Sequence, residues 1–255
     1  MQNPIAHTPA LALERGSQEE LPRTTPAQAP TVWEQLAGVY SEPIALFQRL
    51  SRKPRWGQAF WLVIAAAFLM MTFWALKVDV DALQRPVLEK SASLTASQIE
   101  QTISVSQRFI LPMTYISATL RNLFGVLAMG FVFWLVAVTT NEKQKPTFLH
   151  AVSAATIPNL ILIPYMLMIA VVCMLRPVGA RIPERLAPSG LAYYLQPHNA
   201  RVYGLLAQID PFIIGYFVLM YFAVRHVMRL KTSDAAICTT LAVVLTVAYK
   251  VYFWV

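Results

Sequence analysis

Asp210 holds the position in this sequence that most strongly suggests chemistry, because it is an acidic residue inside an apolar run and Pro211 follows it directly. A carboxylate within a membrane costs roughly 3 kcal/mol unless it is paired or protonated, so it is a candidate site for an ion, a proton or a partner. Asp before Pro is also an arrangement that begins helices, with the carboxylate as the N-cap. A functional carboxylate and a helix cap near the membrane interface are both open alternatives.

Two further prolines, Pro158 and Pro164, interrupt another apolar run, and Asn159 and Tyr165 each follow one of them directly. A proline within a helix frees a backbone carbonyl. Helices broken in this way, as also at Pro211, bind substrates in many transporters, where Asn and Tyr side chains beside the break can serve as ligands. The alternative, which we favour, is a structural kink that neighbouring helices stabilise.

His150 lies near the start of the same run and has the side chain that titrates closest to neutral pH. The sequence places no second His or Cys at ligand spacing from it, so we expect interfacial packing and no metal site. The motifs HExxH, GxSxG and the P-loop do not occur either. The sequence therefore predicts neither a cofactor nor enzymatic activity.

Five long runs with few charges must position these residues, in a chain that is 56% hydrophobic and only 13% charged. About 20 apolar residues of helix cross a bilayer core, and unbroken runs exclude the alternation of a barrel strand. The sequence predicts an all-α, polytopic transmembrane helical bundle. Its membrane domain is expected over residues 56–255, with about five spans near residues 56–76, 117–141, 147–175, 203–224 and 235–253.

The region before the first span divides into two parts. Residues 1–30 are rich in Pro, Gln and Ala and are expected to form a disordered cytoplasmic tail. Residues 31–55 show helical spacing of apolar side chains, which predicts two short amphipathic helices, the second with Ser41 as its N-cap. We expect these helices to lie at the membrane surface as a platform, or to pack against the bundle, and the two alternatives are compatible. The platform residues are Trp33, Tyr40, Leu46, Phe47, Arg49, Arg52 and Lys53.

Charge near the spans predicts the orientation. The basic cluster from Arg49 to Arg55 favours a cytoplasmic N-terminus, which after five crossings places the C-terminus outside, in a bacterial inner membrane. Outside we expect a helix over residues 95–110 that begins with a Thr95–Gln98 capping box, and an irregular loop over 177–201. That loop argues against the orientation, since the arginines near it outnumber its acidic residue, Glu184.

Three sequence segments together resemble the Yip domain family of five-span membrane proteins, in its prokaryotic form. The resemblance spans residues 32–250 and rests on three motifs: Tyr40-Ser41-Glu42-Pro43 with the downstream Phe47, Leu50, Pro54 and Trp56; Leu94 to Glu100; and Ile209-Asp210-Pro211-Phe212. Bacterial relatives often place an aromatic residue where this chain has Gly215. The Asp-Leu-Tyr-Gly-Pro signature of eukaryotic members, which are named for interaction with Ypt/Rab GTPases, is absent, so GTPase binding is not carried over.

The resemblance implies a non-enzymatic membrane protein that organises partners or membrane shape through its cytoplasmic N-terminal platform. The expected partners are membrane lipids and proteins at that platform, and a homo-oligomer is left open. Nucleic acid is not expected, because the basic residues flank apolar spans. The alternative is a small transporter, channel or lipid-handling protein that uses Asp210 and the proline-broken third span.

Overall fold

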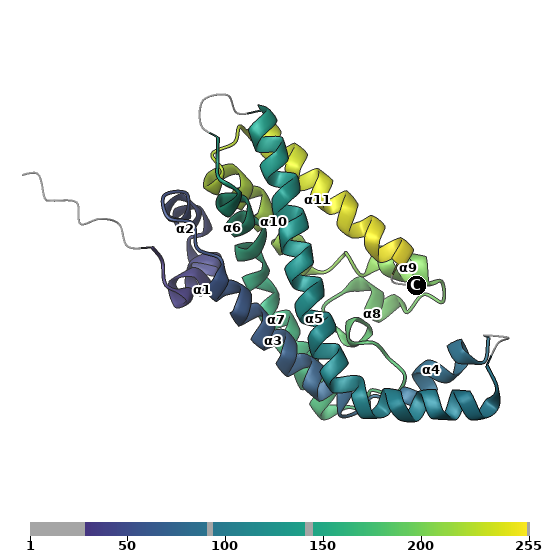
Figure 1. Cartoon of the computed structure of the whole chain (residues 1–255). Coiled ribbons are helices and arrows are strands. Elements are labelled where there is room, and N and C mark those ends of the chain that lie inside the picture. The colour runs from purple at the N-terminus through teal and green to yellow at the C-terminus, as the bar shows by residue number, and fades with distance from the viewer. Residues whose placement is uncertain (1–28, 91–93, 141–144, 254–255) are drawn as a thin grey trace, which may run out of the picture.

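The computed structural model describes residues 29–90, 94–140 and 145–253. Over these ranges the regular elements are helices, arranged as a bundle with a side arm (Figure 1), and a single bridge between Val78 and Gly179 is the one β-type pairing there. The predicted all-α bundle is confirmed. The tail expected over residues 1–30 lies almost entirely outside the described residues.

Four continuous stretches of helix are long and apolar enough to cross a membrane. They are α3 (Gly57–Ala75), α5 (Ala96–Thr140), the segment Phe148–Leu175, and α11 (Thr232–Phe253). A fifth crossing requires α9 (Ala200–Leu206) and α10 (Pro211–Val227) to count as one span, although they meet at a bend of 59°. Within the fourth span expected over residues 203–224 the helix breaks at Asp210 and Pro211, and the continuous part is α10.

The third span is the segment that the two prolines interrupt. It consists of α6 (Phe148–Thr156), a short 3₁₀ helix η1 (Ile157–Leu162) and α7 (Ile163–Leu175). A 3₁₀ stretch at this point follows from the missing proline N–H groups, which cannot continue the α-helical bonding pattern.

Two short helices precede the spans, α1 (Val32–Ser41) and α2 (Pro43–Leu50). A reciprocal capping box begins α1: the Glu34 amide donates to Thr31 Oγ1 at 3.3 Å, and the Thr31 amide donates to Glu34 Oε2 at 2.7 Å. The expectation of Ser41 as the N-cap of α2 is wrong. Ser41 is the last residue of α1, where its hydroxyl donates to the Ala37 carbonyl, and Glu42 is the N-cap without a side-chain bond.

The expected outer helix and the second span are one helix, because α5 continues through Pro112 for 45 residues. The Thr95–Gln98 capping box at its start is confirmed, with the Thr95 amide 2.8 Å from Gln98 Oε1. In Figure 1 the first part of α5 runs sideways below the bundle and then turns upward into it. This first part packs with α4 (Val80–Leu88) to form a side arm.

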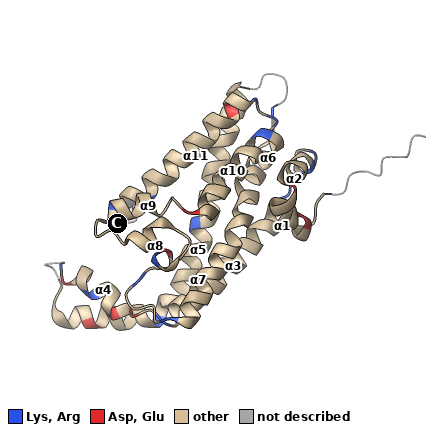
Figure 2. Ribbon diagram, turned by 180° about the vertical axis from the view of Figure 1, so that it is seen from behind, with Lys and Arg blue, Asp and Glu red and all other residues tan. Residues whose placement is uncertain are grey.

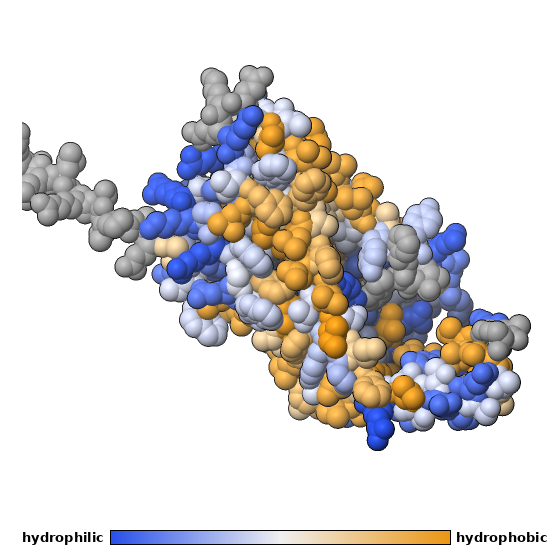
Figure 3. Space-filling model, viewed as in Figure 1, coloured by the Kyte–Doolittle hydropathy of each residue, from blue (hydrophilic) through white to orange (hydrophobic). Residues whose placement is uncertain are grey.

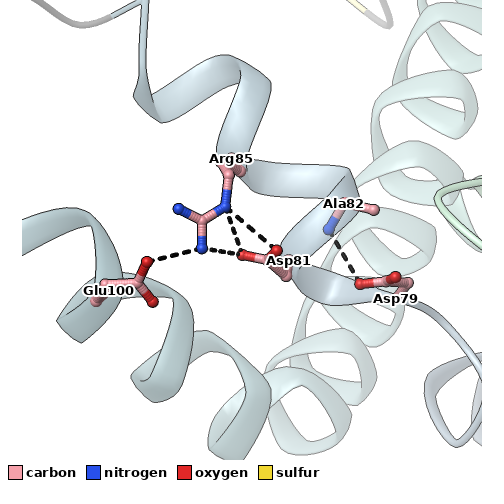
Figure 4. Close-up of polar contacts among 5 residues, drawn as sticks. All are labelled: Asp79, Asp81, Ala82, Arg85 and Glu100. Atoms are coloured by element: carbon pink, nitrogen blue, oxygen red, sulfur yellow. Dashed lines mark hydrogen bonds and ion pairs between the residues drawn. The ribbon is translucent and has the colours of Figure 1, made fainter. Parts of the chain in front are cut away.

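A three-residue clasp joins the two helices of the arm (Figure 4). Arg85 bonds through Nε to Asp81 Oδ1 at 2.9 Å and through Nη2 to Glu100 Oε1 at 2.8 Å, which links α4 to α5. Both carboxylates raise the pKa of the Arg85 guanidinium above its ordinary value, so this group stays charged at any physiological pH.

The bundle core is built where α2, α6 and η1 pack against α10. Leu46, Phe47, Phe133 and Met220 are fully buried there. Apolar side chains of α5 and α11 instead face outward, among them Phe124 and Val244. They contribute to the orange surface of the bundle in Figure 3, as expected for a surface in contact with lipid.

Two glycines permit close approaches between elements. A Cβ atom at Gly130 would lie 3.1 Å from Val152 Cγ2 and 3.2 Å from its Cα, so α5 and α6 cross almost backbone to backbone. A Cβ atom at Gly215 would lie 2.8 Å from Ile161 Cδ1. Ile161 of η1 therefore packs directly against α10 at Gly215.

The segment between α7 and α10 is better ordered than the irregular loop expected over residues 177–201. It contains the 3₁₀ helix η2 (Pro183–Leu186) and α8 (Leu191–Leu195) before α9 begins. The rest of the molecule holds this segment by hydrogen bonds to its backbone carbonyls. Trp74 Nε1 donates to the Arg181 carbonyl at 2.8 Å, and the Asp79 amide donates to the Gly179 carbonyl at 3.0 Å. The loop is therefore a fixed cover over one end of the bundle.

Candidate functional site

Asp210 caps α10, so of the two alternatives for this residue the structure shows the helix cap. The carboxylate is 1% exposed, and its Oδ1 accepts a bond from the Phe212 amide at 2.8 Å. Its Oδ2 accepts a short bond from the Ser189 hydroxyl in the loop before α8. A Cβ atom at Gly190 would lie 3.3 Å from Oδ2, so only a small residue fits beside the carboxylate. Asp210 thus fastens the loop to the start of α10.

A cluster of polar side chains surrounds this cap. Tyr165 lies on the same side of the bundle, with its ring centroid 6.1 Å from that of Phe212, and Asp210 and Glu184 are both close enough to act on it electrostatically. Glu184, Asp210 and Arg121 in turn interact electrostatically with Lys250. The structure therefore brings Asp210 and Tyr165 together, as the transport hypothesis required, but adds charged groups that the hypothesis did not contain.

Glu184 is the central acidic group of this cluster. Burial raises the pKa of its carboxyl above the ordinary value, whereas the positive charges of Arg121 and Lys250 lower it. Tyr203 donates to the Glu184 backbone carbonyl at 3.0 Å, which fixes the position of η2 against α9. The cluster joins α5, η2 and α11 at one level of the bundle.

An open cleft of about 740 Å³ adjoins the cluster where α5 turns from the arm into the bundle, and we call it the elbow cleft. Its walls are mainly apolar, with Met71 and Trp74 from α3 and Phe109 and Met113 from α5, and the charged groups lining it are Arg121 and Glu184. Figure 3 shows a hollow between the bundle and the arm. The shape and chemistry suit an apolar or amphipathic occupant, with lipid the most available one.

Asn159 does not join this cluster. Its Nδ2 donates to the carbonyls of Ala155 and Thr156, at 2.8 and 3.1 Å, within its own broken helix. Pro158 beside it is buried in the core. The amide therefore stabilises the break, as the structural-kink alternative required.

Pro164 frees the carbonyl of Leu160, the acceptor that its own amide would have used in an α-helix. The Tyr40 hydroxyl donates to this carbonyl at 3.1 Å. The Ile163 backbone N–H donates to the same carbonyl at the end of η1, so the tyrosine adds a second bond there and links α1 to η1.

His150 lies at the start of α6, whereas Tyr165 lies in the first turn of α7, beyond the break of the third span. Its Nδ1 is 2.7 Å from Thr147 Oγ1, and its Nε2 is 3.2 Å from the Ser51 carbonyl just after α2. The ring therefore links α6 to the platform, which is the packing role expected for it. Among the residues that the structure describes, no three His, Cys, Asp or Glu side chains gather as a metal site would need.

The platform has two sides. Leu46 and Phe47 are 0% exposed and face the bundle, so for these two residues the packing alternative holds and a contact with lipid or a partner is wrong. The outer side exposes the remaining platform residues: Trp33, Tyr40, Arg49, Arg52 and Lys53.

Sequence reasoning did not identify Glu184 and Lys250 as members of a site. Lys250 lies near the end of the last span, where a single Lys looks like an interfacial anchor, and Glu184 looked like one charge of a surface loop. The available signal was that Glu184 is the one acid in a segment otherwise charged by arginines. That signal does not reveal which distant cation the carboxylate meets.

The fold and the distribution of charge define a class of protein. Figure 2 shows the charged positions gathered at the ends of the bundle and on its loops, with long uncharged stretches between them, as in a multi-pass integral membrane protein. The chain belongs to the Yip1 family: the family model described as Yip1 domain matches residues 37–254. No curated protein and no solved structure shows a significant match to the chain.

Proposed function

We propose that this protein is a non-enzymatic integral membrane protein that organises other proteins at the membrane, or its shape, through the outer side of its N-terminal platform. One observation carries the proposal: α1 and α2 are fixed to the bundle on one side and expose aromatic and basic groups on the other. Leu46 and Phe47 are buried, while Trp33 in α1 is 66% exposed, and Arg49 and Arg52, at and just after the end of α2, are exposed as well.

The physical argument is that a rigid surface binds at lower entropic cost than a flexible one. Three bonds or contacts to the bundle hold the platform: the Tyr40 bond to the Leu160 carbonyl, the His150 contact with the Ser51 carbonyl, and the buried side of α2. An exposed Trp with neighbouring arginines has the composition of binding hot spots between proteins. The exposed basic residues also favour a partner surface, or a membrane surface, that is acidic.

The proposal includes the orientation in which this platform faces the cytoplasm and the C-terminus lies outside, in a bacterial inner membrane. The positive charge at Arg49, Arg52, Lys53 and Arg55 supports it.

The second candidate, a transporter built on Asp210 and the broken third span, has lost support. Both carboxylate oxygens of Asp210 accept bonds that hold the fold together, and the Asn159 amide is used within its own helix. Both groups therefore have a structural role in the fold. What remains of this candidate is lipid handling at the elbow cleft, where Arg121 and Glu184 meet an apolar wall.

A reversal of charge on the platform tests the proposal. The variant Arg49→Glu/Arg52→Glu changes exposed groups, and because these arginines also favour the cytoplasmic N-terminus, its orientation is verified by labelling a Gln48→Cys copy. The matched control is Arg108→Glu, an equally exposed arginine on the arm. Proteins crosslinked to each variant in native membranes are quantified by mass spectrometry against the unaltered chain. We expect at least one partner to fall tenfold in the platform variant and to persist in the control.

An unchanged set of crosslinked proteins in the platform variant would contradict the proposal. Leu46→Glu or Phe47→Glu is unsuitable as a test, because a charge at either buried position would disrupt the core and remove partners for trivial reasons.

A further inference from the structure

The segment from the end of α7 into the first turn of α9 carries more positive charge than an outer loop is expected to have. It contains Arg176, Arg181, Arg185 and Arg201 against Glu184 alone. The positive-inside tendency does not account for these arginines at the end of the bundle opposite the platform. The charge therefore fits a binding role better than an orienting one.

The folded loop gathers part of this charge around a pocket of about 300 Å³. The polar residues that line it include Arg181, Arg185, Tyr193, Gln196 and His198. None of the described residues that line the pocket is Asp or Glu. The pocket therefore offers donors and positive charge without a built-in anion to neutralise them.

Glu184 is the acidic residue nearest to these arginines in sequence, and it lines other cavities. It lines the elbow cleft and a small pocket of about 40 Å³ beside Lys250. The short stretch of chain from Arg181 to Arg185 thus lies between two cavities. Residues 182–184 line the mainly apolar elbow cleft, and Arg181 and Arg185 line the basic pocket.

The pocket is preorganised by contacts that do not use the side-chain N–H groups of Arg181 and Arg185. The Trp74 bond to the Arg181 carbonyl fixes one arginine backbone. The Arg185 guanidinium lies over the Tyr203 ring, 4.9 Å from its centroid, and the Tyr203 hydroxyl bonds to the Glu184 carbonyl. A guanidinium stacked in this way keeps its N–H groups available at its edges.

The surroundings of the pocket suit a lipid. It lies just beyond the end of α7 at Leu175, and α8 next to it exposes Tyr194 (68%) and Leu195 (59%). Val202 and Leu205 of α9 are exposed as well. Apolar side chains beside a basic pocket at the end of a span fit acyl chains and a headgroup together.

We infer that this pocket binds the phosphate of an anionic phospholipid in the leaflet opposite the platform. Arg181 and Arg185 supply the planar, paired donors that phosphate oxygens prefer, and His198 and Gln196 complete the polar wall. The inference goes beyond the proposed function, since it concerns the other end of the molecule and needs no protein partner.

The experiment titrates the purified full chain in uncharged detergent with dioctanoyl phosphatidylglycerol, using dioctanoyl phosphatidylcholine as the zwitterionic control. Binding is followed by native mass spectrometry and by the rise in Tm. We expect preferential binding of the anionic lipid, weakened at least tenfold by Arg181→Gln/Arg185→Gln. The matched control is Arg201→Gln, which removes an exposed arginine of the same segment that does not line the pocket, and should change binding less than twofold.

If the double variant does not fold, Arg181→Gln alone serves, because its side chain is exposed and its backbone makes the structural bond. Equal losses in Arg201→Gln and the pocket variants would overturn the inference, since general surface charge would then be responsible. Inorganic phosphate or glycerol 3-phosphate is added as a competitor in a separate titration. Displacement of the lipid by either at equal concentration would overturn the assignment to a phospholipid and indicate a soluble phosphate ligand.

Discussion

Tyr40 shows how a single side chain can compensate for a helix break far away in the sequence. It lies 120 positions from Leu160, yet its hydroxyl adds a second bond to the carbonyl that loses its α-helical donor at Pro164 and accepts from the Ile163 amide instead. In a bilayer backbone polar groups need partners within the protein, so the break and the tyrosine are physically coupled. The same bond fixes α1 to the third span.

Tyr40→Phe should lower the stability of the protein by about 1 kcal/mol, because it removes one of the two bonds that the Leu160 carbonyl accepts. The measurement is Tm and reversible unfolding in detergent. Tyr252→Phe, at an exposed tyrosine near the end of α11, is the control and should have no effect. Equal stability of the Tyr40 variant and the unaltered protein would mean that the bond contributes nothing.

Asp210 allows a test that separates a cap from a functional charge. Asp210→Ala should destabilise the protein by about 2 kcal/mol, because it removes the acceptors of the Phe212 amide and the Ser189 hydroxyl. Asp210→Asn retains a side-chain oxygen and should cost less than half as much. If Asn and Ala were equally damaging, the negative charge itself, and not the cap, would be what the fold requires.

Glu184 predicts a specific pH dependence of stability. Its pKa is raised from an ordinary value of about 4.5, chiefly by burial. The folded state therefore binds the proton more tightly than the unfolded state, and this contribution to stability is present below the ordinary pKa and lost as pH rises through the raised one. Relative to Glu184→Gln, the unaltered protein should lose Tm as the pH rises from below the ordinary carboxyl pKa of 4.5 through the raised one.

The difference in Tm between the two proteins, measured across this range, checks the prediction. Subtracting the variant removes the titration of other acids, including Glu34, whose pKa the Thr31 bonds lower. A difference that grew in favour of Glu184 with rising pH would instead mean that Arg121 and Lys250 dominate its environment.

At the scale of elements, α5 combines two tasks in one helix. Its first part lies along the arm with α4, and the rest enters the bundle and crosses α6 at Gly130. The Arg85 clasp holds the arm, and close backbone packing holds the crossing. Small residues at such crossings are typical of membrane helices, where packing rather than the hydrophobic effect drives association.

Gly130→Ala should therefore destabilise the protein by about 1–3 kcal/mol, because the new methyl group meets the Val152 backbone. Gly125→Ala lies in the same helix and is the matched control, since a Cβ atom there meets nothing within 4 Å. The control should be neutral or slightly stabilising because alanine favours the helix. Similar Tm losses in both variants would point to an effect of helix conformation and not of packing.

At the scale of the whole molecule, the α1–α2 platform and the loop before α10 lie at opposite ends of the bundle (Figure 1). The proposed partner surface and the proposed lipid pocket therefore face opposite sides of the membrane. This arrangement makes the orientation of the chain decisive for both proposals.

Cysteine labelling tests the orientation. The native Cys173 and Cys238 are buried, so single exposed cysteines at Gln48→Cys and Glu89→Cys report on α2 and on the segment after α4. With a membrane-impermeant maleimide on intact cells, Glu89→Cys should react and Gln48→Cys should react only after permeabilisation. The reverse pattern would place the N-terminus outside.

The sequence by itself determined that the chain is helical and which family it resembles. It also gave the number of candidate membrane-crossing helices to within one. Span length is a local property, since it depends only on a run of apolar residues matched to the bilayer thickness. The Asp210-Pro211 pair also carried its own helix-start signal, although the sequence left its role open.

Only the tertiary structure decided which face of each element is used. Leu46 and Phe47 have the spacing of a surface-lying helix, and no local rule distinguishes a lipid surface from a packed helix as their partner. The bond between Tyr40 and Leu160, the meeting of Glu184 with Lys250, and the pocket between Arg181 and His198 join residues far apart in the chain or brought together by its turns. Such contacts depend on how whole helices pack, which sequence periodicity does not encode.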